Sequence, residues 1–175
     1  MSIEPDNDLA LNNASIIYLQ HNKLKKAEEY ALRAARVKPK IPDAFVTLSL
    51  IYLAQNKTDL AELTVKRALQ LAPDKPEALS VLGNIFLATE RPEQAQQQFE
   101  HARQLYGETA GNLVDLASLA ASRGDTKRAI DLLERALTLG YNNKYLLAKG
   151  PLFAPLLKQS RYLELLKRYF PQTAP

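Results

Sequence analysis

The clearest hydrophobic pattern in this chain lies in residues 42–75, where a short polar break separates two apolar stripes. The first stripe has the three- and four-residue spacing of one helical face: Phe45, Leu48 and Tyr52. Asn56 and Lys57 interrupt it, and a second stripe of the same spacing follows: Ala61, Val65, Ala68 and Leu69. Because proline lacks the amide donor and clashes with the preceding turn, Pro73 is expected to end the second helix. The segment therefore predicts two helices joined by a turn.

The same pattern recurs four times with a period of 34 residues. Its register is marked by Pro5, Pro39, Pro73 and Gly107. Two alanines recur at fixed spacing: Ala27 with Ala34, Ala61 with Ala68, Ala95 with Ala102, and Ala129 with Ala136. Bulky side chains at these positions would overpack a close helix–helix contact. A spacing that persists over four periods predicts a repeat array, and such arrays usually present a binding surface.

These residues resemble the tetratricopeptide repeat (TPR), a helix–turn–helix unit of about 34 residues. The family pattern is a large apolar residue, Leu, a small residue, an aromatic residue, Ala, an aromatic residue, Ala and Pro. The second repeat supplies Phe45, Leu48, Ser49, Tyr52, Ala61, Val65, Ala68 and Pro73. The third supplies Leu79, Leu82, Gly83, Phe86, Ala95, Phe99 and Ala102, with Gly107 in place of proline. The first supplies Leu11, Ala14, Ser15, Tyr18, Ala27, Ala31, Ala34 and Pro39. The fourth departs most, with Leu113, Leu116, Ala117, Ala120, Ala129, Leu133 and Ala136, and Tyr141 where proline is expected.

The resemblance covers Asp8 to about Tyr141 and implies an all-α fold. The expected architecture is a right-handed TPR superhelical solenoid of four repeats, 8–41, 42–75, 76–109 and 110–143, with a helical C-terminal cap. Residues 1–7 have the register of a repeat's end, so we expect the tail of a preceding, truncated repeat and a larger parent protein. Residues 144–170 are expected to form a degenerate repeat with capping helices, and residues 171–175 a frayed tail.

The C-terminal stretch leaves the repeat register at Gly150-Pro151, in the middle of what would be a fifth first helix. It resembles the GY…LFxPL…RYxxLL endings of bacterial repeat proteins, which are often fused to winged-helix regulators, nucleotide cyclases or kinases. The resemblance implies a bacterial source. A solenoid needs its last apolar face covered, and atypical terminal units do this.

Composition sets further bounds on the class of protein. The 175 residues, 46% of them hydrophobic, suit one solenoid domain. No cysteine is present, which excludes disulfides and thiolate metal sites. No apolar run approaches the roughly 18 residues of a membrane helix, and the start MSIEPDND lacks the features of a signal peptide. These observations favour a cytoplasmic location.

The residue inventory does not favour catalysis. The two histidines, His21 and His101, are far apart in the sequence, and neither belongs to a metal-binding or nucleophile motif. Adjacent Glu28 and Glu29 point in different directions on a helix and indicate a solvated face. No phosphate-binding glycine motif is present. We therefore expect a protein that is not an enzyme and needs no metal or cofactor.

In tetratricopeptide arrays the first helix of each repeat lines a concave groove, which implies where a ligand would bind. The corresponding positions in the first three repeats include Asn12, Ile16, Leu19, Asp43, Val46, Leu50, Leu53, Glu77, Ser80, Asn84 and Leu87. Leu9 precedes this set, and the fourth repeat contributes Gly111, Val114, Ser118 and Ala121. The Lys/Asn/Arg clamp that chaperone-binding members use is absent, because its positions hold Asn12, Ile16, Thr47, Glu77 and Val81. An apolar stripe flanked by Asp43 and Glu77 remains.

Net charge +4 and a pI of about 9.2 raise the question of nucleic-acid binding. None of the groove positions is Lys or Arg, and the basic residues instead collect on second helices and turns: Lys23, Lys25, Lys26, Arg33, Arg36, Lys38, Lys40, Lys66 and Arg67. Phosphate binding needs a continuous basic face. A convex patch over residues 23–40 could bind nucleic acid only weakly, and a solvated face is the simpler interpretation.

The sequence thus predicts a protein–protein interaction scaffold whose groove accepts an apolar or weakly basic helix or extended peptide. Two alternatives remain open at this stage. One is a structural module that self-associates as a homodimer through the groove or the C-terminal cap. The other is weak nucleic-acid association through the convex basic patch.

Overall fold

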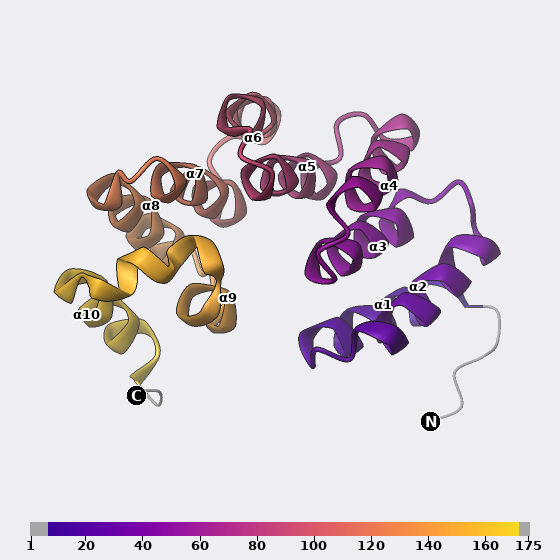
Figure 1. Cartoon of the computed structure of the whole chain (residues 1–175), viewed down its shortest axis with the longest axis horizontal. Helices are drawn as coiled ribbons and strands as arrows, with labels where there is room; N and C mark the ends of the chain where they lie inside the picture. The colour runs from indigo at the N-terminus through magenta and orange to yellow at the C-terminus, as the bar shows by residue number, and fades with distance from the viewer. Residues whose placement is uncertain (1–6, 172–175) are drawn as a thin grey trace. The chain divides into compact units, whose positions relative to one another are not determined.

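A computed structural model describes residues 7–171, and all the regular elements in this range are helical (Figure 1). In chain order the repeats contain α1 (Asp8–Gln20) and α2 (Leu24–Val37), α3 (Pro42–Ala54) and α4 (Thr58–Leu71), α5 (Pro76–Ala88) and α6 (Pro92–Tyr106), and α7 (Ala110–Ser122) and α8 (Thr126–Thr138). The chain then forms α9 (Lys144–Lys149), the 3-10 helix η1 (Pro151–Lys158) and α10 (Ser160–Tyr169). The first helices begin 34 residues apart, at residues 8, 42, 76 and 110. The sequence predicts the tail of a preceding repeat at residues 1–7 and a frayed tail at residues 171–175. Of these two segments only Asn7 and Pro171 are among the described residues.

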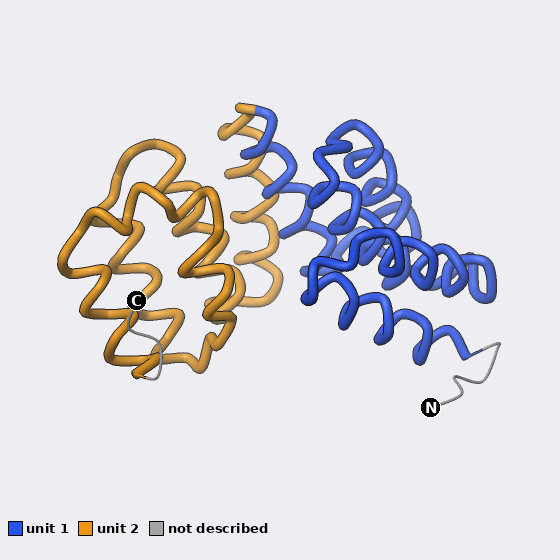
Figure 2. Tube along the Cα trace, turned by 60° about the horizontal axis from the view of Figure 1, so that its bottom comes forward, with its two compact units in different colours: residues 1–89 blue, residues 90–175 orange. Residues whose placement is uncertain are grey.

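The chain forms two compact units, residues 1–89 and 90–175 (Figure 2). Unit 1 contains α1 to α5, and unit 2 contains α6 to α10. The sequence suggests one continuous solenoid domain, whereas the boundary between the units falls inside the third repeat, between its two helices. A pattern with a fixed 34-residue period treats every repeat alike, so it carries no signal of this division.

The turn inside each repeat contains one residue in the left-handed region. Asn22, Asn56 and Glu90 have φ of 55°, 60° and 57°, and Gly124 has 77° at the same register. Asparagine and glycine tolerate this conformation best. Proline at the first turn of α3, α5 and α6 is compatible with the helix, because the amide it lacks would have no intrahelical partner.

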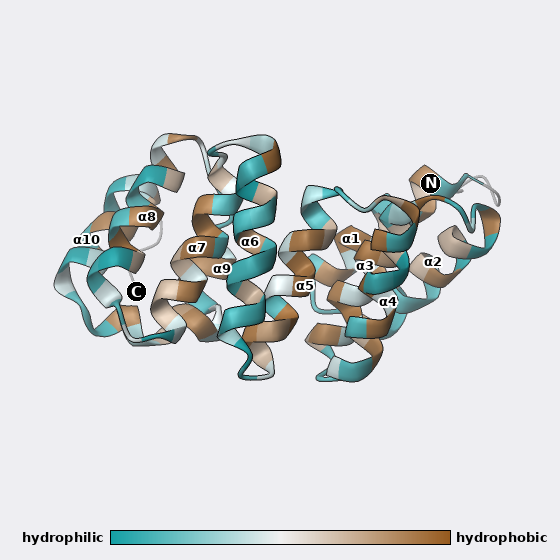
Figure 3. Cartoon of the chain, turned by 90° about the horizontal axis from the view of Figure 1, so that it is seen from above, coloured by the Kyte–Doolittle hydropathy of each residue, from teal (hydrophilic) through white to brown (hydrophobic). Residues whose placement is uncertain are grey.

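In the last three repeats the first helix is more deeply buried than the second. In α3 buried residues lie on most of the helix surface: Ala44, Val46, Thr47, Leu48, Ser49, Ile51 and Tyr52. In α4 only one stripe is buried, formed by Ala61, Val65 and Ala68. The cause is that α3 packs against its partner α4 and also against α1, α2 and α5. Hydropathy follows the same division, with α3 and α5 mainly hydrophobic and α6 mainly hydrophilic (Figure 3).

In unit 2 the last helices cover the fourth pair. One buried cluster, here called the C-terminal core, joins residues of α7 and α8 to Leu147, Phe153, Leu156, Tyr162 and Leu165. The Tyr162 hydroxyl donates a hydrogen bond to the carbonyl oxygen of Leu147 over 2.9 Å. The segment that follows the last repeat therefore packs as a cap on α7 and α8.

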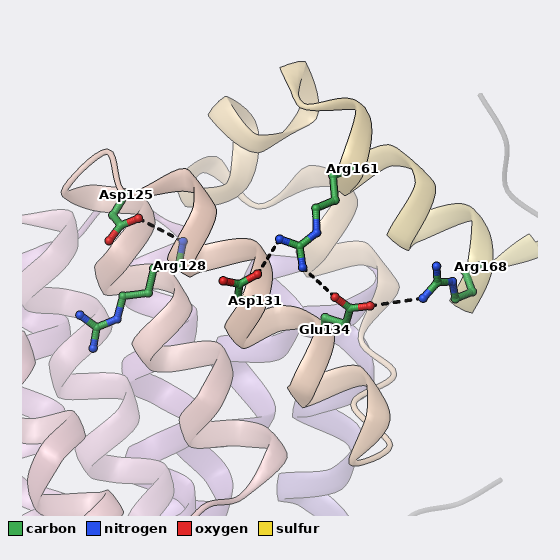
Figure 4. Close-up of polar contacts among 6 residues, drawn as sticks. All are labelled: Asp125, Arg128, Asp131, Glu134, Arg161 and Arg168. Atoms are coloured by element: carbon green, nitrogen blue, oxygen red, sulfur yellow. Dashed lines mark hydrogen bonds and ion pairs between the residues drawn. The ribbon is translucent and has the colours of Figure 1, made fainter.

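Ion pairs reinforce the contact between α10 and α8 (Figure 4). Arg161 bridges Asp131 and Glu134, and Arg168 also reaches Glu134, over 3.2 Å. The hydrogen bonds that Arg161 donates to the carboxylates of Asp131 and Glu134 raise its pKa, so its charge is retained throughout the working pH range. All these groups are partly exposed, so the pairs fix the position of α10 more than they add to stability.

Candidate protein-binding face

The groove positions predicted from the sequence lie on three neighbouring helices of unit 1. Helix α3 packs against both α1 and α5. We call these predicted positions together the binding face: Asn12, Ile16 and Leu19 on α1, Asp43, Val46, Leu50 and Leu53 on α3, and Glu77, Ser80, Asn84 and Leu87 on α5.

Two large apolar side chains at equivalent repeat positions are exposed on the binding face. Ile16 and Leu50, 34 residues apart, are each 37% exposed. Leu19 and Leu53, also equivalent, are half-buried beside them. Val46 and Leu87 are buried, so they belong to the core and expose little surface to a ligand. The apolar part of the face is therefore smaller than the sequence predicts.

Asn12 is the most enclosed polar residue of the binding face. Its side chain is 9% exposed, and the carboxamide oxygen Oδ1 is buried without a hydrogen-bond partner among the described residues. An unsatisfied buried acceptor costs about 1–3 kcal/mol. Further along the face, the Asn84 side-chain amide donates to the carbonyl oxygen of Ser80 over 3.0 Å.

The two acidic residues of the binding face share one lysine that the sequence reasoning missed. Lys75 Nζ lies 3.2 Å from Asp43 Oδ1 and 3.2 Å from Glu77 Oε2. Burial disfavours the Lys75 ammonium, but its carboxylate neighbours Glu77 and Asp43 outweigh burial and raise its pKa. The only sequence signal was the position of Lys75, directly before the first-turn proline of α5. This end of the face carries a net charge of about −1 rather than −2.

In unit 2 the chain itself covers the equivalent face of the fourth pair. Three of the four equivalent α7 positions, Val114, Ser118 and Ala121, are buried, whereas Gly111 at the helix start is exposed. Val114 and Ala121 belong to the C-terminal core together with Phe153 and Leu156 of η1, and η1 packs against α7. A short apolar segment, Pro151–Lys158, thus packs on this helix.

The clamp positions of chaperone-binding members are not available as a polar site. Thr47 and Val81 are buried in the core of unit 1, and Ile16 is apolar. Glu77 would repel a carboxylate. These positions therefore offer a carboxylate no basic side chain.

The basic residues of α2 and its flanking turns are exposed but interspersed with acidic and aromatic partners. Lys38 pairs with Asp8 over 2.7 Å, and this hydrogen-bonded contact lowers the pKa of Asp8. Lys26 and Arg33 lie over the rings of Tyr18 and Tyr30, 5.6 Å and 5.5 Å from the ring centroids. Glu28 and Glu29 share the helix with them. The surface is therefore a mixed one rather than a continuous basic face.

Within residues 7–171 no group of three His, Asp or Glu side chains could hold a metal ion. His21 Nδ1 lies 2.8 Å from the carbonyl oxygen of Ile17, at the end of α1. None of the described helices is long and apolar enough to cross a membrane.

Comparison with known proteins agrees with the repeat pattern. Sequence models described as tetratricopeptide repeat match residues 12–76, 52–111 and 113–144. The chain belongs to the tetratricopeptide repeat family. A comparison with the curated proteins found no match.

Several solved structures share this fold. The PilF protein of Pseudomonas aeruginosa superposes with a TM-score of 0.67 at 22% identity, over 96% of this chain and 77% of PilF. A thermophilic TPR protein of Thermus thermophilus gives 0.73 at 18% identity, over 93% of this chain and 83% of that protein. The first TPR of Spaghetti (RPAP3), bound to the HSP90 peptide SRMEEVD, gives 0.62 at 18% identity, over 70% and 99%. At these identities the likeness concerns the fold.

Proposed function

We propose that this chain is a non-enzymatic protein-interaction scaffold, and that its binding face on α1, α3 and α5 binds an apolar or weakly basic helix or extended peptide. Tetratricopeptide repeat domains are generally protein-interaction scaffolds. The RPAP3 domain with its HSP90 peptide is one structural relative that binds a peptide. Because this chain lacks the carboxylate clamp, its ligand should differ in chemistry from an acidic C-terminal peptide.

The observation that carries the proposal is the difference between equivalent positions of the two units. In α7 the position equivalent to Ile16 and Leu50 holds Ser118, which is 4% exposed, and the chain's own apolar segment η1 packs against this helix. In α1 and α3 the large apolar side chains Ile16 and Leu50 remain exposed. Exposed apolar side chains that lie together on a surface are typical of interaction sites.

The chemistry of the face defines the ligand class. Ile16 and Leu50 favour an apolar side chain, for which full burial contributes about 1.5–3 kcal/mol. The net negative charge of the Asp43–Lys75–Glu77 group favours a neutral or weakly basic ligand. Translational and ordering losses offset much of the apolar gain, so we expect affinities in the micromolar range.

The test is a selection of peptides from a displayed random library on the whole chain, followed by binding measurements with two variants. Leu50→Asp places a carboxylate in the apolar part of the binding face and should reduce the affinity of the selected peptides by more than about tenfold. Leu63→Asp changes a leucine of α4 that is 69% exposed and serves as the matched control. A circular dichroism melt of both variants should stay close to that of the wild type.

Three outcomes contradict the proposal. Selected peptides that bind Leu50→Asp as tightly as the wild type would show that the binding surface lies elsewhere. A strong fall of affinity with added salt would indicate binding to charged groups, as for phosphates on the basic patch of residues 23–40, because apolar burial depends little on salt. Self-association would be favoured instead if no peptide binds and sedimentation velocity shows that the wild type is a dimer, which Leu50→Asp dissociates.

A further inference from the structure

The side of α4 that points away from the core of unit 1 carries two exposed leucines. Leu60 and Leu63 are 40% and 69% exposed. Leu63 lies two residues from each of the buried Ala61 and Val65, so it points about 160° away from both. Leu63 therefore contributes little to the packing of α4 against α3. We call the exposed residues of this side the outer face of α4: Asp59, Leu60, Leu63, Lys66 and Arg67.

The two leucines are particular to this repeat. The second helices of the other repeats have polar or charged residues at both positions: Lys26, Gln94 and Arg128 in place of Leu60, and Glu29, Gln97 and Asp131 in place of Leu63. The repeat fold therefore does not need an apolar side chain at either position. A single exposed leucine would need no explanation, but two on one side of a helix, where every equivalent position is polar, indicate a contact surface.

The charged residues of α4 are divided along the length of the helix. Asp59 and Glu62 lie in its first half, whereas Lys66 and Arg67 lie in its second half. Lys66 pairs with Glu62 of its own helix over 2.6 Å, and Asp59 makes no ion pair among the described residues. The four charges sum to zero, so two such helices do not repel each other through their net charge.

The outer face of α4 is complementary to itself when two copies run antiparallel. Helical geometry places Asp59 and Lys66 on one edge of this face, on either side of Leu63 along the helix, and Leu60 and Arg67 on the other edge. Antiparallel packing about Leu63 therefore brings Asp59 beside the partner's Lys66. It also brings Leu60 against the aliphatic stem of the partner's Arg67. The two-fold symmetry repeats each contact, and opposite charges meet in both.

We infer that the outer face of α4 is a self-association surface, on which the α4 helix of a second copy of this chain packs antiparallel. A parallel arrangement would instead place like charges together, which disfavours it. The surface is separate from the binding face, which lies on first helices. Helix α4 has 14 residues and is about 21 Å long. Two helices of this length bury less than the roughly 1,200 Å² of a stable complex, so we expect a reversible dimer with a dissociation constant of about 0.1–1 mM.

Sedimentation equilibrium of the whole chain, at protein concentrations up to about 1 mM, tests the inference. The wild type should show a monomer–dimer equilibrium. Leu63→Asp should raise the dissociation constant by about tenfold or more, because it places two carboxylates at the centre of the contact. Gln97→Asp introduces the same charge at the equivalent exposed position of α6 and should leave the equilibrium unchanged. Leu50→Asp should also leave it unchanged, which separates this surface from the binding face.

Charge reversal tests the antiparallel arrangement. Asp59→Lys and Lys66→Asp should each raise the dissociation constant by about threefold or more at low salt, because each places like charges together twice in the dimer. The variant with both reversals should recover most of the loss, since its charges again meet their opposites.

Three results would overturn the inference. The first is a wild type that stays monomeric at every concentration, which would leave the outer face of α4 to a different polypeptide. The second is a dimer that Leu63→Asp does not weaken, or that Leu50→Asp dissociates, since the contact would then lie elsewhere. The third is a double reversal that dimerises no better than the single ones, since the helices would then not run antiparallel.

Discussion

The Ser49 hydroxyl donates a hydrogen bond to the carbonyl oxygen of Ala61 over 2.8 Å, linking the two helices of the second pair. One period earlier, Ser15 makes the same bond to Ala27, also over 2.8 Å. Both serines are fully buried. The small residue in this position of the repeat therefore does more than allow a close approach, because in two repeats it also binds the backbone of the facing helix.

Ser49→Ala should lower the free energy of unfolding of unit 1 by about 1 kcal/mol, the net contribution of a typical buried hydrogen bond. Urea denaturation followed by circular dichroism measures the change. Ser122→Ala is the control, because Ser122 is exposed and bonds only to Leu119 of its own helix. Equal effects of the two substitutions would mean that the Ser49 bond contributes nothing specific.

Ala61→Arg should destabilise the chain by more than about 3 kcal/mol, because it places excess volume and a charge at a fully buried position. The matched control is Leu63→Arg on the same helix, where the side chain is 69% exposed. Thermal melts of the two variants should differ clearly. A wild-type melt for Ala61→Arg would refute the packing of α3 against α4.

Gly150→Ala should destabilise the C-terminal cap by about 1–3 kcal/mol. A Cβ at residue 150 would clash with the backbone carbonyl of Leu146 and touch its side chain. At Gly111, by contrast, the nearest atom to an added Cβ is Thr109 Oγ1 at 3.9 Å, so Gly111→Ala should be neutral or slightly stabilising. Hydrogen exchange in α9 and α10 distinguishes the two variants, and a faster exchange only for Gly111→Ala would contradict the structure.

Unit 2 should lose stability in alkali because it contains a buried tyrosine, Tyr162, and a half-buried one, Tyr141. Burial, with a contribution from the charge of Asp115, raises the pKa of Tyr141 to about 12. Burial also raises the pKa of Tyr162. Since the unfolded value is about 10, the neutral rings stabilise the fold below about pH 10, and this stability is lost as the pH rises towards 12.

The free energy of unfolding should fall by up to about 1.4 kcal/mol per pH unit for each tyrosine. Urea melts of the wild type and Tyr141→Phe across this range measure it. The Phe variant should depend less steeply on pH, whereas Tyr145→Phe, at a side chain that is 74% exposed, should behave as the wild type. Identical pH dependence of all three proteins would exclude Tyr141 as the cause.

The 34-residue pattern by itself determined the family and the all-helical class, because three- and four-residue spacing and recurring small residues are local properties of the chain. It also located the exposed Ile16 and Leu50, since equivalent repeat positions have equivalent directions on a helix. That the face bearing them binds a ligand stays a prediction, as do the boundaries of the repeats and the bacterial source.

Only the tertiary structure decided which groove positions are exposed. Val46 lies one helical turn before Leu50, and Leu87 occupies the repeat position of Leu53. Both Val46 and Leu87 are nevertheless buried, because burial depends on how closely neighbouring helices approach and not on the position along one helix. Lys75 was missed for a similar reason: its ion pair with Asp43 joins the end of the second repeat to its beginning, and the sequence does not show that these residues approach each other. The covering of α7 by η1 likewise arises from a segment outside the repeat register, whose path no periodic pattern predicts.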